Sequence, residues 1–191
     1  TSVKEAFNKW REYLDQFGFG RPLGSDVVNE KSGFLPTAGF YDNRYGQGRW
    51  KALTIISLAI GQGEVGASPL QMANMTAAIA NRGYYYSPHI VRAIGDSLNK
   101  TRGLSVKHGI EIDPENFESI ISGMEAAVNG GPGATATIAA IDSITVCGKT
   151  GTAQNPHGKD HSIFIAFAPK EKPEIAIAVY VENAGFGATY A

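Results

Sequence analysis

The chain has 191 residues, of which 43% are hydrophobic and 18% charged, and its formal net charge is −1 at pH 7. This balance is typical of a folded soluble protein and argues against disorder, while the lack of a basic block removes the electrostatic signature of nucleic-acid binding. The length permits one domain over residues 1–191, no apolar run reaches the length of a membrane span, and the lone Cys147 cannot form an intrachain disulfide.

The first expected element is an amphipathic helix. Ser2 and Glu5 have the spacing of a capping box, which places the start of a helix at Val3. Apolar residues then recur at helical spacing as far as Phe17, and Gly18 ends the pattern. This wide apolar face must pack against something, and where it stays uncovered we expect self-association.

The next segments are less regular. Residues 18–50 are rich in Gly, Pro, Asp and Asn without sustained periodicity, which predicts a long loop. Residues 53–60 are apolar and fit either a strand or a buried helix, because so short a run has no decisive period. A short strand is expected over residues 89–94.

Two more helices are expected, over residues 68–81 and 113–128. Ser68 and Pro69 open the first, and Gly83 follows its end. An Asp-Pro dipeptide opens the second, which carries large apolar side chains on one side.

Three apolar runs close the chain and predict strands at residues 144–147, 162–168 and 175–181. A turn rich in Pro and Lys joins the last two, which indicates antiparallel pairing. The runs lack polar alternation, so we expect helices on both faces. The fold class is therefore α+β, an antiparallel sheet flanked by helices.

The first of these strands leads into Lys149-Thr150-Gly151, followed by Thr152. Such a sequence suits acyl transfer on a peptide that ends in a carboxylate. Lys149 supplies a cation, Thr150 a hydroxyl, and Gly151 lets a substrate lie against the strand. The Thr152 N–H could serve as one of two oxyanion donors. Alone, the triplet also fits a strand that runs into a turn.

Several further motifs stand in an order and spacing that resemble class B penicillin-binding proteins, most closely the elongation-type enzymes called penicillin-binding protein 2. The resemblance covers nearly the whole chain and rests on residues 17–20, 30–36, 59–63, 68–73, 81–83, 88–91, 129–133, 148–154 and 164–169.

The resemblance implies the fold of serine β-lactamases and penicillin-binding-protein transpeptidases, and it assigns roles to the matched positions. Lys149 would support the proton network at the nucleophile, and Thr150 and Thr152 would bind the substrate carboxylate. The Thr152 N–H would complete the oxyanion hole, Gly151 would border the substrate, and His161 would line the cleft.

The parent enzyme implied by this resemblance is a D,D-transpeptidase that crosslinks peptidoglycan stem peptides by serine acyl transfer. It would bind β-lactams, work with other cell-wall elongation proteins, and require neither metal nor cofactor. An N-terminal membrane helix would anchor it in the cytoplasmic membrane with the catalytic domain outside, whereas this chain itself is expected to be soluble.

The family's Ser-x-x-Lys nucleophile and Ser-x-Asn motifs have no credible counterpart here. Ser97-Leu98-Asn99-Lys100 matches both but lies among turn residues, so we expect a solvated hairpin turn there. We therefore expect the chain to be the C-terminal part of the transpeptidase domain, inactive alone, without the upstream strands or the final helix that packs on the sheet. A non-catalytic binding or scaffold module and a β-lactamase-like hydrolase fragment remain as alternatives.

Two weaker patterns compete with this interpretation. Gly61, Gly63 and Gly66 match a dinucleotide-binding fingerprint, but no acidic residue follows at the required distance. His157 and His161 have the spacing of two metal ligands on a helix, but Pro156 indicates a loop and a third ligand is lacking.

Overall fold

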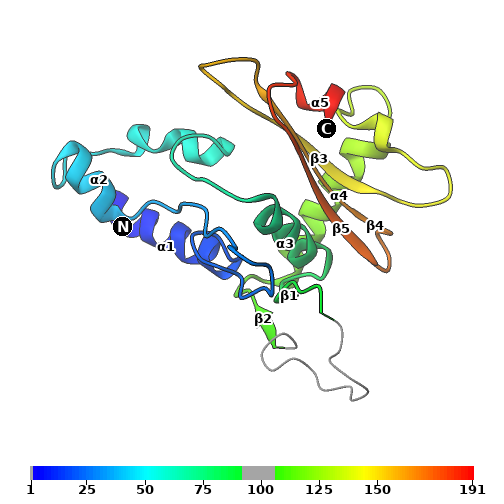
Figure 1. The fold of residues 1–191 in the computed structure, drawn as a ribbon, viewed down its shortest axis with the longest axis horizontal. Coiled ribbons are helices and arrows are strands. Elements are labelled where there is room, and N and C mark those ends of the chain that lie inside the picture. The colour runs from blue at the N-terminus through cyan, green and yellow to red at the C-terminus, as the bar shows by residue number, and fades with distance from the viewer. Residues whose placement is uncertain (1, 92–105) are drawn as a thin grey trace. The chain divides into compact units, whose positions relative to one another are not determined.

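The computed structural model describes residues 2–91 and 106–191, and the chain divides into two compact units (Figure 1). The first unit comprises Thr1–Ser68 with Ser87–Val106, and the second comprises Pro69–Tyr86 with Lys107–Ala191. Within the described ranges, no helix has the length and hydrophobicity needed to cross a membrane.

The first unit begins with helix α1 (Val3–Gln16), and the predicted capping box is confirmed. The Ser2 hydroxyl accepts the Glu5 N–H, and the Glu5 carboxylate accepts the Ser2 N–H. Part of the apolar face is covered, because Phe7 lies edge-on to the rings of Tyr41 and Trp50 at centroid distances of 5.4 and 5.6 Å. The expectation that this helix packs on other elements is confirmed, whereas self-association stays a prediction.

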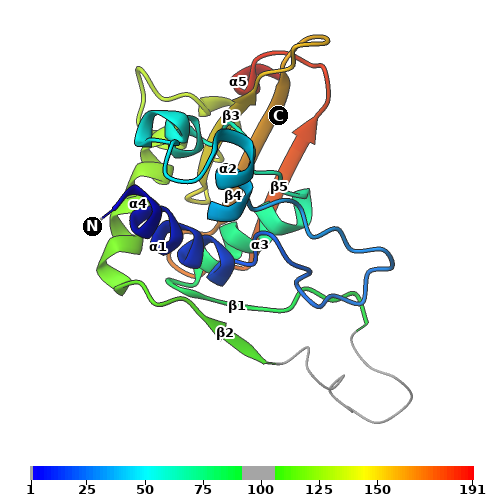
Figure 2. The ribbon, with the colours of Figure 1, turned by 90° about the vertical axis from the view of Figure 1, so that its left-hand side faces the viewer.

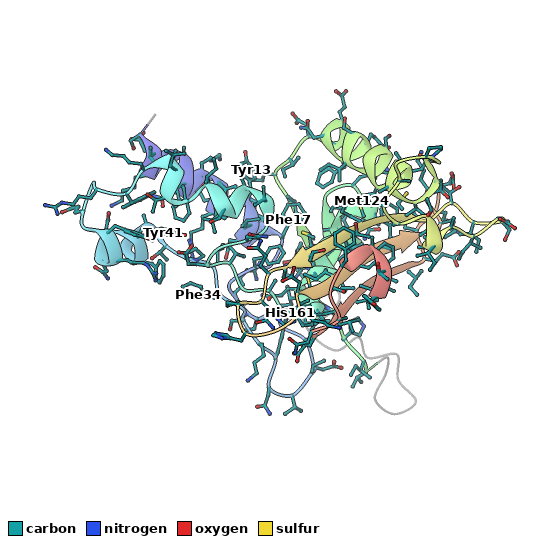
Figure 3. All side chains as sticks on the ribbon, turned by 90° about the horizontal axis from the view of Figure 1, so that it is seen from above. Tyr13, Phe17, Phe34, Tyr41, Met124 and His161 are labelled. Carbon is teal, nitrogen blue, oxygen red and sulfur yellow. The ribbon has the colours of Figure 1, made fainter. Side chains whose placement is uncertain are left out.

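Tyr41 belongs to helix α2 (Ala38–Tyr45), which lies inside the segment predicted to be a loop (Figure 3). The sequence analysis missed it because its apolar residues form no regular stripe. Its start has a recognisable signal, since the Thr37 hydroxyl accepts the Phe40 N–H as an N-cap.

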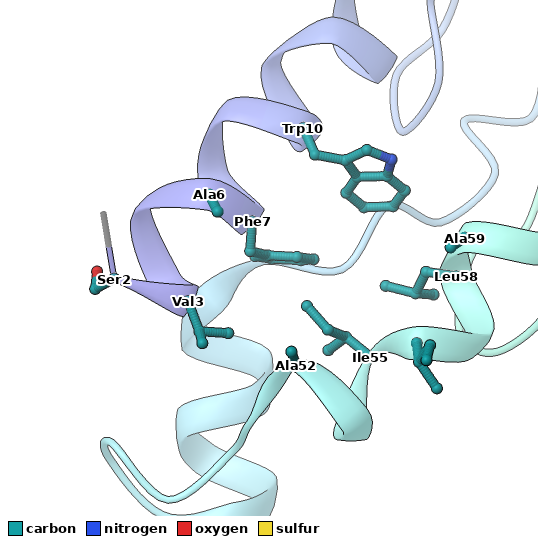
Figure 4. A pocket seen from close by; sticks show the side chains of 10 residues that line it. Ser2, Val3, Ala6, Phe7, Trp10, Ala52, Ile55, Leu58 and Ala59 are labelled. Atoms are coloured by element: carbon teal, nitrogen blue, oxygen red, sulfur yellow. The ribbon is translucent and has the colours of Figure 1, made fainter.

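Residues 53–60 form neither a strand nor a buried helix. They lie in two short 3₁₀ helices, η1 (Ala52–Thr54) and η2 (Ile56–Ile60), and the side chains of Leu53 and Ile60 are mostly exposed. Between these helices and α1 lies an apolar cavity of about 400 Å³, lined in part by Phe7 and Ile55 (Figure 4).

Carboxylates hold the loop that follows α1. Asp26 accepts the N–H groups of Ile90 and Val91, and Glu30 accepts those of Leu23 and Ser25. Residues 89–91 are irregular, so this part of the predicted strand over 89–94 is wrong; residues 92–94 and the expected turn at 97–100 lie outside the described residues.

The second unit contains the two predicted helices, α3 (Pro69–Ala80) and α4 (Pro114–Asn129). On α4, Phe117, Ile121 and Met124 are buried, as expected of an apolar face. A small antiparallel pair, β1 (Tyr84–Tyr86) with β2 (Lys107–Gly109), and the 3₁₀ helix η3 (Thr137–Ala139) complete the connections.

The main sheet consists of β3 (Cys147–Ala153), β4 (His161–Ala168) and β5 (Ile175–Val181). Its order is β3-β4-β5 and both pairings are antiparallel, which confirms the predicted antiparallel arrangement. The predicted bounds of the first strand, residues 144–147, are wrong, because β3 begins at Cys147 and contains the Lys-Thr-Gly sequence itself. Helix α3 packs on β4 and β5, and α4 packs on β3. Ile175 at the outer end of β5 is 60% exposed, so the expectation of cover on both faces is wrong for this strand.

A short helix, α5 (Gly187–Tyr190), follows β5 and packs on β3 and β4, as both Figure 1 and Figure 2 show for β3. The sequence analysis expected no helix after the sheet. This helical turn matters for the site because it brings residues beyond β5 against the Lys-Thr-Gly sequence.

Candidate active-site strand

The Lys-Thr-Gly sequence lies within β3, an edge strand of the three-stranded sheet. Side chains alternate between the two faces of a strand. Lys149 and Gly151 therefore share one face, which we call the Lys face, and Thr150 and Thr152 share the other, the Thr face. Because β4 pairs on only one side, alternate backbone N–H and C=O groups of β3 point away from the described sheet.

The Lys149 side chain is exposed, and its Nζ donates to the Thr150 carbonyl oxygen at 2.7 Å. The charge is thus held near the strand and remains accessible. On the Thr face, the Thr150 hydroxyl lies 3.1 Å from the hydroxyl of Thr135, which precedes η3. The residues before η3 therefore help to orient the hydroxyl of the motif, a contact that sequence reasoning missed.

Gly151 is not required by the packing of the sheet. A Cβ atom at this position would meet Ile163 at 3.4 Å, an ordinary contact. Gly148 differs, since a Cβ there would fall 2.6 Å from the ring of Phe164. The first glycine is needed for packing, and Gly151 leaves the surface of the strand open.

Thr152 is bound by the segment that follows β5. The Gly187 N–H donates to the Thr152 hydroxyl oxygen at 3.1 Å, and Gly187 itself is buried. A Cβ at Gly187 would lie only 1.9 Å from the Gly151 carbonyl oxygen, so only glycine fits. The repeated glycines at 185 and 187 were the available signal for this close approach, and the sequence analysis did not use it.

His161 begins β4 directly opposite Ala153 and lies at the end of the sheet (Figure 3). Its Nδ1 accepts the Asn183 N–H at 3.1 Å, and its ring packs on Tyr180 with centroids 5.3 Å apart. The structure therefore brings His161 and Thr152 to the same end of the sheet. The imidazole of His161 packs on Tyr180 and accepts a hydrogen bond at Nδ1.

Cys147 at the start of β3 is fully buried. Burial raises the pKa of its thiol to about 11, and the nearby charge of Glu125 acts in the same direction. A thiol in this state is a packing residue and not a nucleophile.

Among the described residues, no group of three His, Cys, Asp or Glu side chains is placed to hold a metal ion. His157 and His161 lie in and beside the loop between β3 and β4, where the His157 N–H donates to the Asn155 side chain. The substrate cleft that the resemblance implies, with His161 in its lining, stays a prediction.

The profile of the family described as "Penicillin binding protein transpeptidase domain" matches residues 4–191. The chain belongs to the penicillin-binding protein transpeptidase family. All the motifs that resemble class B members lie within this matched range.

Relatives of the elongation type align with almost the whole chain. The peptidoglycan D,D-transpeptidase MrdA of Acinetobacter baumannii is 33% identical over 98% of this chain, and that of Haemophilus influenzae is 31% identical over 94%. The aligned region is only 29% and 30% of those proteins, so the chain spans less than a third of the length of these relatives.

Solved structures agree with these alignments. Penicillin-binding protein 2 of Pseudomonas aeruginosa, in complex with WCK 5153, superimposes with a TM-score of 0.83 at 32% identity, over 96% of this chain and 39% of that one. Penicillin-binding protein 2 of Helicobacter pylori, in complex with MreC, gives 0.79 at 30% identity over 98% of this chain and 33% of that one. The α+β transpeptidase-like fold is thereby confirmed.

Proposed function

We propose that residues 1–191 are the C-terminal part of the transpeptidase domain of a peptidoglycan D,D-transpeptidase. In this proposal β3 is one wall of an acyl-transfer site whose serine nucleophile lies outside the 191 residues. The observation that carries the proposal is the edge position of β3 in the described sheet, together with the exposed side chain of Lys149.

The role proposed for each residue of β3 is the one that the family resemblance implies. The Lys149 ammonium supports the proton network of the serine and its lysine. The hydroxyls of Thr150 and Thr152 donate to the carboxylate of a D-alanyl peptide or of a β-lactam. The Thr152 N–H stabilises the oxyanion, and Gly151 permits the substrate to lie along the strand.

The partners and the location belong to the same proposal. Two solved relatives support β-lactams and cell-wall elongation proteins as partners of the parent protein. Penicillin-binding protein 3 of Mycobacterium tuberculosis, 25% identical, is complexed with aztreonam, and penicillin-binding protein 2 of Helicobacter pylori is complexed with MreC. A membrane anchor, with the catalytic domain outside the cytoplasmic membrane, is proposed for the parent alone.

Intact-mass spectrometry with a labelled penicillin tests the proposal. We expect no covalent adduct on the 191-residue chain and a stoichiometric adduct on a protein extended upstream to include the family's Ser-x-x-Lys motif. A stoichiometric adduct on the short chain, at Ser97 or any other serine, would contradict the assignment of the nucleophile. Failure of the extended, folded protein to react would favour the non-catalytic scaffold alternative.

A further inference from the structure

The segment after β5, residues 182–187, crosses the end of the sheet that carries Thr152. Every second residue of this segment is bonded to β3, β4 or the loop between them. The Asn183 N–H donates to His161 Nδ1, the Gly185 N–H to the Asp160 carbonyl, and the Gly187 N–H to the Thr152 hydroxyl. The segment is thus held from β4 across to the candidate site.

Side chains make most of these bonds. The hydroxyl of Ser162, which is fully buried, donates to the Gly185 carbonyl at 2.9 Å. The Asn155 side chain donates to the Asn183 carboxamide oxygen at 2.6 Å. Asn183 itself has φ of +54°, the left-handed region that asparagine adopts more readily than most other non-glycine residues.

We propose that His161 is a positioning residue for the candidate site: its unprotonated ring holds the 182–187 segment where Gly187 fixes the Thr152 side chain. This inference rests on the proposed function and gives His161 a role different from contact with the substrate. With one lone pair of its oxygen accepting the Gly187 N–H, the Thr152 hydroxyl keeps its own proton to donate to a substrate carboxylate.

The bond from Asn183 requires an unprotonated nitrogen. An imidazolium carries protons on both nitrogens and has no acceptor, so protonation would set two donors against each other at the Asn183–His161 contact. The prediction is that acidification releases the 182–187 segment and with it the orientation of Thr152.

The other ionisable groups near this contact are the Tyr180 phenol under the ring, Asp160 and Lys159 in the loop, Glu182 beside Asn183, and His157. Burial and the Glu182 charge raise the pKa of Tyr180, so its phenol stays neutral between about pH 5 and pH 8. Asp160, Lys159, Glu182 and His157 all remain in every variant described below, so a difference between the variants reports on position 161.

Amide exchange measured by NMR on the 191-residue chain tests the inference. The protection factor, which corrects for the intrinsic pH dependence of exchange, is compared at about pH 5 and about pH 8 for Asn183, Gly185 and Gly187. In the native chain we expect protection at Asn183 and Gly187 to fall by about tenfold in acid, as for loss of one hydrogen bond. The Thr152 amide shift should change over the same pH range.

Two variants sharpen the result. His161→Asn retains an acceptor that does not titrate, so protection should be the same at both pH values. His161→Phe retains the ring on Tyr180 without the acceptor, so protection should be low at both. The inference would be overturned if the protection factor of Asn183 in the unmodified chain did not depend on pH. It would also be overturned if that protection fell in acid while the protection of Gly187 and the amide shift of Thr152 stayed the same. Because the readout needs no penicillin, its failure is distinct from failure of the proposed function.

Discussion

Gly187 donates its backbone N–H to the hydroxyl oxygen of Thr152, so the segment beyond the sheet is bonded to the residue that we propose as an oxyanion donor. The same backbone lies against the Gly151 carbonyl, where a Cβ would approach to 1.9 Å. The strand that carries the candidate site is therefore supported by a close contact that depends on glycine.

The substitution Gly187→Ala should break this support. The new methyl group cannot be accommodated beside the Gly151 backbone, so the segment must shift at a cost of about 1–3 kcal/mol. Urea unfolding of the second unit, followed by NMR signals of β3 and β4, measures the change. Gly123→Ala is the matched control, because a Cβ there meets nothing within 4 Å on α4 and should stabilise the chain slightly. Equal effects of the two substitutions would contradict the close contact.

The loop after α1 should open in acid. Hydrogen bonds from the Val91 and Ile90 N–H groups lower the pKa of Asp26 below its ordinary 3.8. A carboxylate with a lowered pKa stabilises the folded state above its ordinary pKa, and that contribution disappears as pH falls through the lowered value. Amide protection at Ile90 and Val91 should therefore persist at pH 5, start to decline only below the ordinary pKa of 3.8, and be lost as the pH falls through the lowered pKa of Asp26. Asp26→Asn should weaken it at every pH, and unchanged protection in this variant would refute the role of the carboxylate.

Glu30 acts in the same loop by a balance of two effects. Burial raises the pKa of Glu30, but the hydrogen bonds from the Leu23 and Ser25 N–H groups outweigh burial and lower it overall. Like Asp26, ionised Glu30 therefore stabilises the folded state above its ordinary pKa, and this contribution is lost as the pH falls through the lowered value.

Cys147 should be unreactive in the native chain. Burial raises the pKa of its thiol to about 11, so at pH 8 little thiolate exists and the sulfur is inaccessible. A disulfide-exchange reagent should modify the native chain much more slowly than the chain in denaturant, where one thiol per chain should react. Rapid stoichiometric modification of the native protein would show that the start of β3 is open to solvent.

The regular elements of the second unit could be predicted because each has a local signal in the sequence, either a run or period of apolar residues or a helix-capping residue. The runs that became β4 and β5 and the apolar face of α4 are examples. Helix α2 was missed because an N-cap at Thr37 was its only clear signal within a stretch rich in glycine. The apolar residues 53–60 were misread because a short run does not reveal how much of it will be exposed.

The candidate site was predicted only in part. The sequence analysis placed a strand at residues 144–147 that leads into the motif, whereas β3 spans Cys147–Ala153 and contains the motif itself. The bonds from Gly187 to Thr152 and from Asn183 to His161 join residues far apart in the sequence. They follow from the antiparallel register, which brings the end of β3, the start of β4 and the end of β5 together. No local pattern contains that information.

The most direct test of the account is the rate at which labelled penicillin acylates the upstream-extended protein when Lys149 is replaced. The substitution Lys149→Ala should lower the second-order rate by at least about a hundredfold, because it removes a group from the proton network of the serine. Lys170→Ala is the control, since this lysine pairs with Glu125 and lies outside the Lys149–Thr152 site. The folded Lys170→Ala protein should be acylated at the same rate as the protein without a substitution. A native rate in the Lys149→Ala protein would contradict the assignment of β3 as the wall of an acyl-transfer site.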